Sequence, residues 1–168
     1  MLIIFCGLPG SGKSYLASLL ASKLKLNYLS TDIIRKKKSF EKAYTEDNKF
    51  IVYGNMLSQA VRILSQGKDL IVDGTFYKES LRNMFCREAD SKGHSTKFIY
   101  VFAKEETIRK RLQVKRKYSE ADFAIYIKVK KSFDPLKGDY LLINSEEEDE
   151  GNTIKKIISY IYELHGDR

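Results

Sequence analysis

LIIFC at residues 2–6 runs directly into GLPGSGKS at residues 7–14. The second stretch matches the phosphate-binding P-loop pattern G-x-x-x-x-G-K-[ST] at every fixed position. The first stretch is an apolar run typical of a buried strand, and residues 15–24 carry apolar side chains at helical spacing. A strand, a glycine-rich loop and a helix in this order are the context that the pattern requires. The sequence therefore predicts a loop that binds a nucleoside triphosphate.

Each residue type in the octet has a physical task. Glycines let the backbone curl so that successive N–H groups point inward, and the start of the following helix adds partial positive charge. Lys13 supplies a mobile cation for the β- and γ-phosphates, and the Ser14 hydroxyl is a ligand for Mg²⁺. We expect Lys13 to act in catalysis as well as in binding. The residues expected to bind ATP are Gly7, Pro9, Gly10, Ser11, Gly12, Lys13, Ser14 and Tyr15.

The composition indicates one domain with an affinity for anions. The chain has 168 residues and a formal net charge of +8, which suits nucleotides or nucleic acid but also serves solubility. Two cysteines, Cys6 and Cys86, are too few for a disulfide framework or a zinc site. A strand that begins at residue 2 leaves no room for a signal peptide, and no apolar run reaches membrane-spanning length. We expect a cytoplasmic protein without a membrane segment.

Apolar periodicity predicts strands alternating with helices along the whole chain. The strands are expected at residues 2–6, 27–30, 69–73, 96–103 and 139–143, and the helices at 15–24, 47–66, 78–91, 105–117, 120–131 and 153–164. This alternation predicts an α/β fold with a five-stranded parallel sheet between two helical layers. The ligand crevice should lie at the carboxyl ends of the strands. The acidic run at 146–150 is expected to be a solvated loop.

Asp32 and Arg35 follow the second predicted strand, on the same edge of the sheet as the P-loop. Residues three apart share one face of a helical turn, so both side chains can point into the crevice. Asp32 would then serve as a general base toward an acceptor hydroxyl, and Arg35 would face an adjacent anion. The alternative is that Asp32 is a plain helix N-cap.

Asp73 ends the third predicted strand. A carboxylate in this place often completes a P-loop site by holding Mg²⁺ directly or through water. Asp73 should emerge near Ser14, because the third strand of such sheets commonly neighbours the first. It can instead orient groups on the acceptor side, or simply form the turn that follows.

Two basic segments flank these residues. Residues 108–117 are dense in Arg and Lys, groups that stabilise the charge of a phosphoryl group in transfer. They predict a basic helical lid over about residues 104–131, with Arg111 and Arg116 as catalytic residues, although a solvated helix face is the alternative. RKKK at residues 35–38 directly follows the expected base and would track a polyanionic acceptor, or serve solubility.

With these residues in place, the chain resembles the P-loop kinases of the polynucleotide-kinase-like group, the AAA_33 family. The resemblance extends from residue 1 to about residue 145. Besides the P-loop, it rests on the spacing of Asp32 and Arg35, VDGTF at 72–76, Arg111 in the lid, and SEAD at 119–122 leading to FDP at 133–135.

The resemblance implies an adenylate-kinase-like fold and ATP as phosphate donor with Mg²⁺. It makes Asp32 the base that deprotonates a 5′-hydroxyl and Arg35 the ligand of the neighbouring phosphate, while a lid arginine clamps the donor. The second lid arginine of the family falls on Lys115 here, with Arg116 one place later.

The expected activity is phosphorylation of the 5′-hydroxyl of DNA or RNA by one kinase domain spanning residues 1–168. The same family also phosphorylates small metabolites, so a small-molecule kinase is the alternative. A nucleotide-binding switch with little turnover is a third reading, since a P-loop demonstrates only binding. The sequence does not indicate the oligomeric state.

Overall fold

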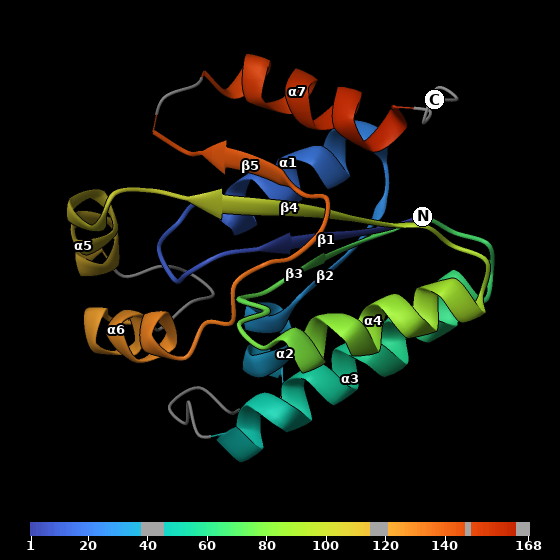
Figure 1. Ribbon diagram of the computed structural model, residues 1–168, viewed down its shortest axis with the longest axis horizontal. Helices are drawn as coiled ribbons and strands as arrows, with labels where there is room; N and C mark the ends of the chain where they lie inside the picture. The colour runs from blue at the N-terminus through green and yellow to red at the C-terminus, as the bar shows by residue number, and fades with distance from the viewer. Residues whose placement is uncertain (38–45, 115–120, 147–148, 164–168) are drawn as a thin grey trace.

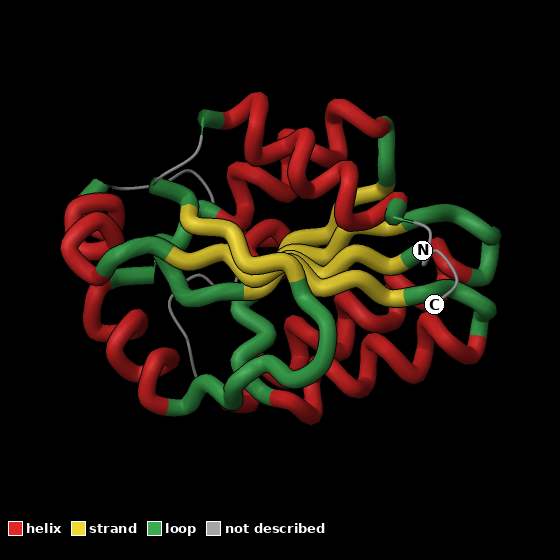
Figure 2. The backbone as a smooth tube through the Cα atoms, turned by 45° about the horizontal axis from the view of Figure 1, so that its top comes forward, coloured by secondary structure: helices red, strands yellow, loops and turns green. Residues whose placement is uncertain are grey.

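The computed structural model describes residues 1–37, 46–114, 121–146 and 149–163. A five-stranded sheet forms the middle of three layers (Figures 1 and 2). All strand pairs are parallel, in the order β2-β3-β1-β4-β5. The strands are β1 (Leu2–Cys6), β2 (Asn27–Ser30), β3 (Leu70–Asp73), β4 (Thr96–Phe102) and β5 (Leu141–Asn144). The predicted α/β architecture and the pairing of the first strand with the third are thereby confirmed.

Helices cover both faces of this sheet, α1 and α7 on one side and α3 and α4 on the other, while α5 and α6 lie beyond the carboxyl ends of the strands (Figure 1). The helices are α1 (Lys13–Leu24), α2 (Thr31–Lys37), α3 (Glu46–Leu64), α4 (Glu79–Ser91), α5 (Glu105–Gln113), α6 (Phe123–Lys131) and α7 (Glu150–Tyr162). Because β1 is covered on both faces, all five of its residues are buried, which explains the continuous apolar run at the start of the chain.

The two faces of β1 belong to two separate cores. Ile4 packs with Val52 and Phe85 from the α3 and α4 layer. Phe5 packs with residues of the α1 and α7 layer such as Leu20. The central strand is thus fixed from both sides, and the P-loop that follows it starts from a rigid base.

The segments that follow β1, β2 and β3 meet at the carboxyl edge of the sheet: a loop after β1, the start of α2 after β2 and a turn after β3. Phe5 lies beside Asp73 in the register of β1 and β3. Gly74 N donates to Phe5 O at 3.2 Å, and Gly7 N donates to Thr75 O at 3.4 Å. These bonds join the beginning of the P-loop to the turn after β3.

Several predicted boundaries are wrong. The helix expected over 105–117 ends at Gln113, because Val114 has extended backbone angles (φ −90°, ψ 122°). Glu146, Asp149 and Glu150, the residues of the acidic run that the structure describes, are exposed as expected, but they do not all lie in a loop. Asp149 caps α7 by accepting from Asn152 N at 2.9 Å, and Glu150 is the first residue of that helix.

Not every apolar residue of α3 lies on its buried stripe. Phe50 and Ile51 are exposed, whereas Val52, Tyr53 and Met56 are buried. Both cysteines are free thiols, and burial raises the pKa of Cys6 to about 12. Among the helices of the described residues, none combines the length and the apolar character needed to cross a membrane.

Candidate active site

The P-loop has a positive φ, which favours glycine, at Gly7, Gly10 and Gly12. Gly7 has φ 144°, and a Cβ there would lie 2.2 Å from Val101 O. Gly12 has φ 94° and stands immediately before α1. A side chain at Gly7 would clash with a backbone carbonyl, and one at Gly12 would be strained by the positive φ. These two glycines of the motif are therefore required for steric reasons.

Lys13 and Ser14 begin α1, where the free N–H groups of the helix end favour an anion. The Lys13 side chain is only 9% exposed, and its Nζ lies 3.5 Å from Leu8 O. Ser11 is completely buried within the loop, and Tyr15 projects outward with 60% exposure. The loop therefore presents Lys13 inward and Tyr15 outward.

Two cavities flank the P-loop, and Gly10 lines both. We call them the inner and the outer cavity. The inner cavity is lined by Pro9, Gly10, Lys13, Ser14, Thr31, Asp32, Arg35, Lys49, Tyr53, Thr75, Ala121, Ile125 and Val129. The outer cavity, of about 480 Å³, is lined by Gly10, Gly12, Tyr15, Leu16, Arg111, Val114, Ser145, Glu150 and Thr153.

The inner cavity brings Asp32 and Arg35 together with Lys13. Both come from α2, which starts directly after β2 and so places its first turn at the carboxyl edge of the sheet. Arg35 is 8% exposed, whereas the next two residues of the basic run, Lys36 and Lys37, are exposed and do not line this cavity. The remaining residue of that run, Lys38, lies outside the described residues.

Asp73 lies at the end of β3 and is buried to 1% exposure. Its Oδ2 accepts from the Tyr28 hydroxyl at 3.0 Å and from Ser30 Oγ at 3.2 Å. Burial, and next the charge of Asp73, raises the pKa of Tyr28, so that hydroxyl remains a donor. Within the described part of the chain, no group hydrogen-bonds to the buried Oδ1.

The oxygen atoms of Ser14 and Asp73 suit Mg²⁺, a hard cation that is commonly held by one or two protein ligands together with substrate phosphates. A buried carboxylate oxygen such as Asp73 Oδ1 ordinarily has a partner, which an ion or its water would supply. Across the described ranges, no cluster of three or more His, Cys, Asp or Glu side chains forms a metal cage of its own.

The turn after β3 contributes a third wall of the inner cavity. The Tyr53 hydroxyl accepts from Phe76 N at 2.8 Å and lies 3.2 Å from Thr75 Oγ1. Arg82 Nη1 donates to Phe76 O at 2.8 Å. Phe76 has φ 45°, a strained angle for a bulky residue, and these bonds hold it there. Burial raises the pKa of Tyr53 to about 12, so it stays neutral at physiological pH.

Arg111 contacts the P-loop from the outer side. Its guanidinium donates to the Gly10 and Ser11 carbonyl oxygens at 3.3 and 3.4 Å, and to Ser145 Oγ and O at 2.8 and 3.2 Å. It is therefore half-buried against the loop rather than a solvent-facing lid residue. Lys115 and Arg116, the two candidates for the second lid cation, lie outside the described residues.

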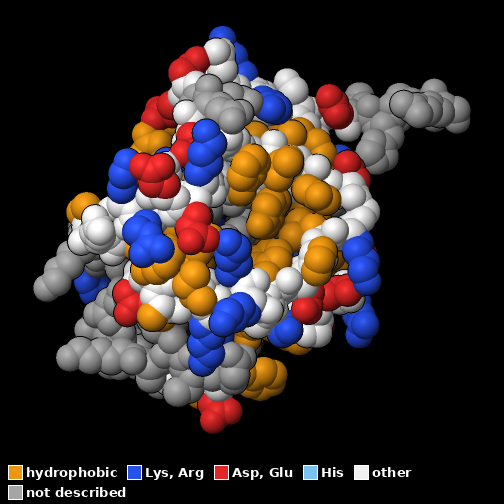
Figure 3. All heavy atoms as spheres, turned by 60° about the vertical axis from the view of Figure 1, so that its left-hand side comes forward, with side chains coloured by type: hydrophobic (Ala, Val, Ile, Leu, Met, Phe, Trp, Pro, Cys, Tyr) orange, Lys and Arg blue, Asp and Glu red, His pale blue; other side chains and the backbone are white. Residues whose placement is uncertain are grey.

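The other basic residues of α5 are held by acidic neighbours. Lys110 pairs with Glu106 at 2.7 Å, and Arg109 lies 3.9 Å from Glu105. In Figure 3, which brings this end of the molecule forward, Lys and Arg side chains are interspersed with Asp and Glu side chains. The described part of the predicted basic lid is therefore a mixed-charge surface.

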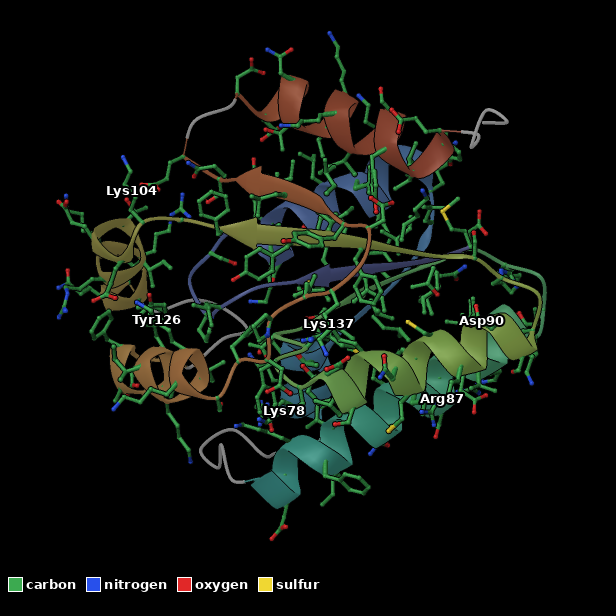
Figure 4. All side chains as sticks on the ribbon, viewed as in Figure 1. Lys78, Arg87, Asp90, Lys104, Tyr126 and Lys137 are labelled. Atoms are coloured by element: carbon green, nitrogen blue, oxygen red, sulfur yellow. The ribbon has the colours of Figure 1, made fainter. Side chains whose placement is uncertain are left out.

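α5 and α6 are joined through Glu105. It accepts from Tyr126 Oη at 3.3 Å and from Lys130 Nζ at 2.8 Å, and the Lys130 bond lowers the pKa of Glu105. Tyr126 lies between the two helices in Figure 4. This contact places Ile125 and Val129, also on α6, where they line the inner cavity opposite the strand ends.

Several residues that line the inner cavity were not predicted as site residues from the sequence, including Lys49, Tyr53 and Ile125. The sequence position of Lys49 could have identified it as a site residue. It lies four residues before Tyr53 on α3, in the stripe that Met56 and Leu64 continue into the core. A lysine in the buried stripe of an amphipathic helix is uncommon unless a site uses its charge.

Comparisons with known proteins identify the family and the fold of the chain. A family model described as an AAA domain, AAA_33, matches residues 2–136. An adenylate kinase from Aster yellows witches'-broom phytoplasma (strain AYWB) is 34% identical over 129 residues, which cover 69% of this chain and 59% of that protein. The chain thus spans less than two thirds of this relative.

Two solved structures share the fold over nearly their whole length. Kti12 from Chaetomium thermophilum, in complex with ADP-AlF3, has a TM-score of 0.76 and 18% identity, with 96% of this chain and 99% of that chain covered. A gluconokinase from Sinorhizobium meliloti 1021 has a TM-score of 0.72 and 14% identity, with 95% and 90% covered. The P-loop kinase fold and the match of the family model over most of the sequence place this chain in the AAA_33 family.

Proposed function

We propose that the protein is an ATP-dependent kinase that transfers the γ-phosphoryl group to a hydroxyl of a small acceptor, and that this hydroxyl enters the inner cavity, whose volume is about 50 Å³. One observation carries this proposal: Lys13 and Ser14 of the P-loop open onto the same cavity as Asp32 and Arg35. A donor site and a base with a neighbouring cation thus share one enclosed space, which phosphoryl transfer requires.

Each charged side chain has a separate role in this proposal. Asp32 accepts the proton of the acceptor hydroxyl as the oxygen attacks phosphorus. Lys13 and Arg35 stabilise the negative charge that spreads over the transferring oxygens. Ser14, with Asp73 behind it, would hold Mg²⁺, which neutralises charge on the donor phosphates when bound.

The outer cavity is the proposed place for the donor nucleoside. Leu16 and Val114 give it apolar surface, and Arg111 contributes a planar guanidinium. Its volume of about 480 Å³ falls within the range of small-ligand sites. Because Gly10 borders both cavities, a donor in the outer cavity would extend its phosphates over the loop toward Lys13.

A small acceptor is favoured over a polymer by the walls of the inner cavity. Ile125 and Val129 of α6 close it opposite the strand ends. The phytoplasma relative is named an adenylate kinase and one structural relative a gluconokinase, both names of small-acceptor enzymes. A nucleotide switch would need neither Asp32 nor Arg35 beside the P-loop.

Phosphorylation of a nucleic-acid 5′-hydroxyl is the second candidate. It is favoured by Lys36 and Lys37, which are exposed on α2 directly after Arg35. A single strand held by these cations would release condensed counterions, with a slope of about 0.7 per phosphate contact in log affinity against log salt.

The test is transfer of label from γ-labelled ATP with Mg²⁺. Three acceptor sets are offered in parallel: nucleoside monophosphates, sugars and sugar acids, and 5′-hydroxyl oligonucleotides, each also with Lys13→Ala. We expect label in a small acceptor and none with the variant. Label only in oligonucleotides, with a steep salt dependence, would favour the second candidate. Label released only as inorganic phosphate in every set would contradict both.

A further inference from the structure

Arg82 is a buried cation on α4 that lines neither the inner nor the outer cavity. It is 4% exposed, and an arginine is seldom buried unless its charge and its donors are used. The guanidinium donates to three main-chain carbonyl oxygens. Nη1 donates to Phe76 O at 2.8 Å, and Nη2 donates to Asp134 O and to Pro135 O, each at 2.9 Å. One side chain therefore joins the turn after β3 to residues 132–140, which we call the α6–β5 linker.

A second set of bonds holds the linker on the same turn. Asp134 N donates to Tyr77 O at 2.8 Å. The Asp134 carboxylate accepts from Glu79 N, at the start of α4, at 3.0 Å and from Lys78 Nζ at 3.2 Å. Lys137 Nζ donates to Glu79 Oε2 at 3.1 Å, and Lys78 and Lys137 lie at this place in Figure 4. These bonds and those of the guanidinium together form what we call the linker junction.

Both segments that meet at the linker junction lead directly to walls of the inner cavity. In the turn after β3, Thr75 lines the cavity and is followed by Phe76, whose carbonyl oxygen Arg82 binds. On the other side, Val129 lines the cavity from α6, and the linker follows that helix directly. A guanidinium is planar and its donors point in fixed directions, so it holds its acceptors at set positions. The separation of α6 from the turn therefore depends on Arg82.

α6 has few other connections that hold it in place. Among the described elements it packs chiefly against α5, where Glu105 joins it through Tyr126 and Lys130. Glu105 and Lys130 are exposed, and an ion pair in water contributes little to a fixed geometry. The guanidinium of Arg82 is shielded from water, where hydrogen bonds from a charged donor are strong. Of the two connections, the linker junction should therefore dominate the position of α6.

We propose that Arg82 is a positioning residue for phosphoryl transfer. By holding the linker on the turn after β3, it fixes α6 at the separation from that turn at which the inner cavity orients the acceptor hydroxyl. Arg82 lines neither cavity, so it reaches the acceptor only through α6 and leaves the outer cavity unaffected. The inference deepens the proposed function and rests on it for the transfer step, but the position of α6 can be measured without turnover.

The first experiment measures the distance between a spin label on α6 and one on α4. Lys128→Cys and Asp90→Cys place the labels at exposed positions, and Cys86→Ser removes the half-buried native thiol, the other native thiol being buried. With Arg82 unchanged, we expect one narrow distance distribution. Arg82→Met should broaden it or shift its maximum by more than about 2 Å, the scale of a loop rearrangement. Arg87→Met is the matched control, because Arg87 is exposed and lies farther along the same helix (Figure 4).

Thermal unfolding of each variant separates positioning from folding. Arg82→Met leaves three carbonyl oxygens without their donor, so we expect it to melt below the wild type. Arg82→Lys keeps the charge, but an ammonium does not reproduce the fork of donors, so its label distances should shift in the same direction by less. If Arg82→Met does not fold, Arg82→Lys and Asp134→Ala, a change at a half-exposed side chain, take its place. A lower melting temperature with unchanged label distances would overturn the proposal.

The second experiment measures steady-state kinetics with the acceptor that the label-transfer test identifies. Arg82→Lys should raise the KM for the acceptor about tenfold and lower kcat, because a displaced acceptor hydroxyl is poorly oriented, and should leave the KM for ATP within about twofold. A loss of folded enzyme alone would lower kcat with both KM values unchanged. That result, or an equal rise in both KM values, would refute the positioning role. If no acceptor is phosphorylated but the label distances depend on Arg82, the proposed function fails while the role of Arg82 in placing α6 stands.

Discussion

The inner and outer cavities differ in what their walls are made of, although they share the P-loop. The outer cavity is bordered by exposed groups such as Tyr15 and Val114, whose exposed fractions are 60% and 68%. The inner cavity is bordered by buried charges, among them Arg35 and Lys49. Exposed apolar surface suits a planar base that leaves after each turnover, whereas buried charges suit a small polar group held in one orientation. The difference indicates that the two substrates are recognised by separate parts of the molecule.

The largest effect on phosphoryl transfer should come from a change at Lys13 of the P-loop, which borders both substrates. Lys13→Ala removes the cation of the donor phosphates, and we expect phosphoryl transfer to fall by about 10³-fold or more. The measurement is the initial rate with labelled ATP, with circular dichroism as the control for folding. A variant with near wild-type turnover would show that the P-loop is not the donor site.

The second-largest effect should come from a change at Asp32 in the inner cavity, and it should lower turnover without weakening ATP binding. Asp32→Asn keeps the shape of the side chain but removes the proton acceptor, so kcat should fall by about 10²- to 10⁴-fold. The affinity for a fluorescent ATP analogue should stay within about twofold of wild type. A parallel loss of nucleotide affinity and turnover would instead assign Asp32 a structural role in the first turn of α2.

A smaller effect is expected on the outer cavity alone. Arg111→Ala removes the guanidinium that joins the P-loop carbonyl oxygens to Ser145, and the KM for ATP should rise about tenfold. The KM for the acceptor should remain unchanged. Lys110→Ala is the matched control, because Lys110 is an exposed cation on the same helix and pairs with Glu106 at 2.7 Å. Equal effects of the two changes would mean that only the net charge of α5 matters.

The smallest effect should come from crowding the turn after β3. In Gly74→Ala the new Cβ would lie 2.9 Å from Thr31 Cγ2 and from the Tyr53 hydroxyl. Both neighbours line the inner cavity, so we expect a loss of about 1–3 kcal/mol in unfolding free energy and a several-fold higher acceptor KM. Gly54→Ala is the control, since nothing lies within 4 Å of a Cβ there. A rise in the KM for ATP rather than for the acceptor would contradict the division of roles.

The P-loop that the two cavities share could be predicted from the sequence, because its parts are local. β1, the P-loop and α1 are contiguous in the chain, and their pattern fixes the positions of Lys13 and Ser14. Arg111 was identified from the charge density of α5. The contact between Arg111 and Ser145 could not be predicted, because the two residues meet only when β5 pairs with β4.

The other residues of the inner cavity could be predicted from the sequence only in part. Asp32 and Arg35 follow a strand closely enough for their place to be predicted. Lys49 reaches the cavity through the packing of α3 against α2, which depends on which stripe of α3 is buried. That stripe contains Met56 and Leu64 but not the apolar Phe50, which is exposed, so the pattern of apolar residues alone does not define it. The end of α5 at Gln113 likewise has no glycine or proline to mark it.

A double-mutant cycle tests the separation of the two cavities most directly. The specificity constant kcat/KM for ATP and for the acceptor is measured in wild type, Arg111→Ala, Gly74→Ala and the double variant. Changes at independent sites add within about 0.3–0.5 kcal/mol, so we predict additive losses, with Arg111→Ala acting on ATP and Gly74→Ala on the acceptor. A coupling energy above about 1 kcal/mol, or a shift of both constants in each single variant, would contradict separate donor and acceptor sites.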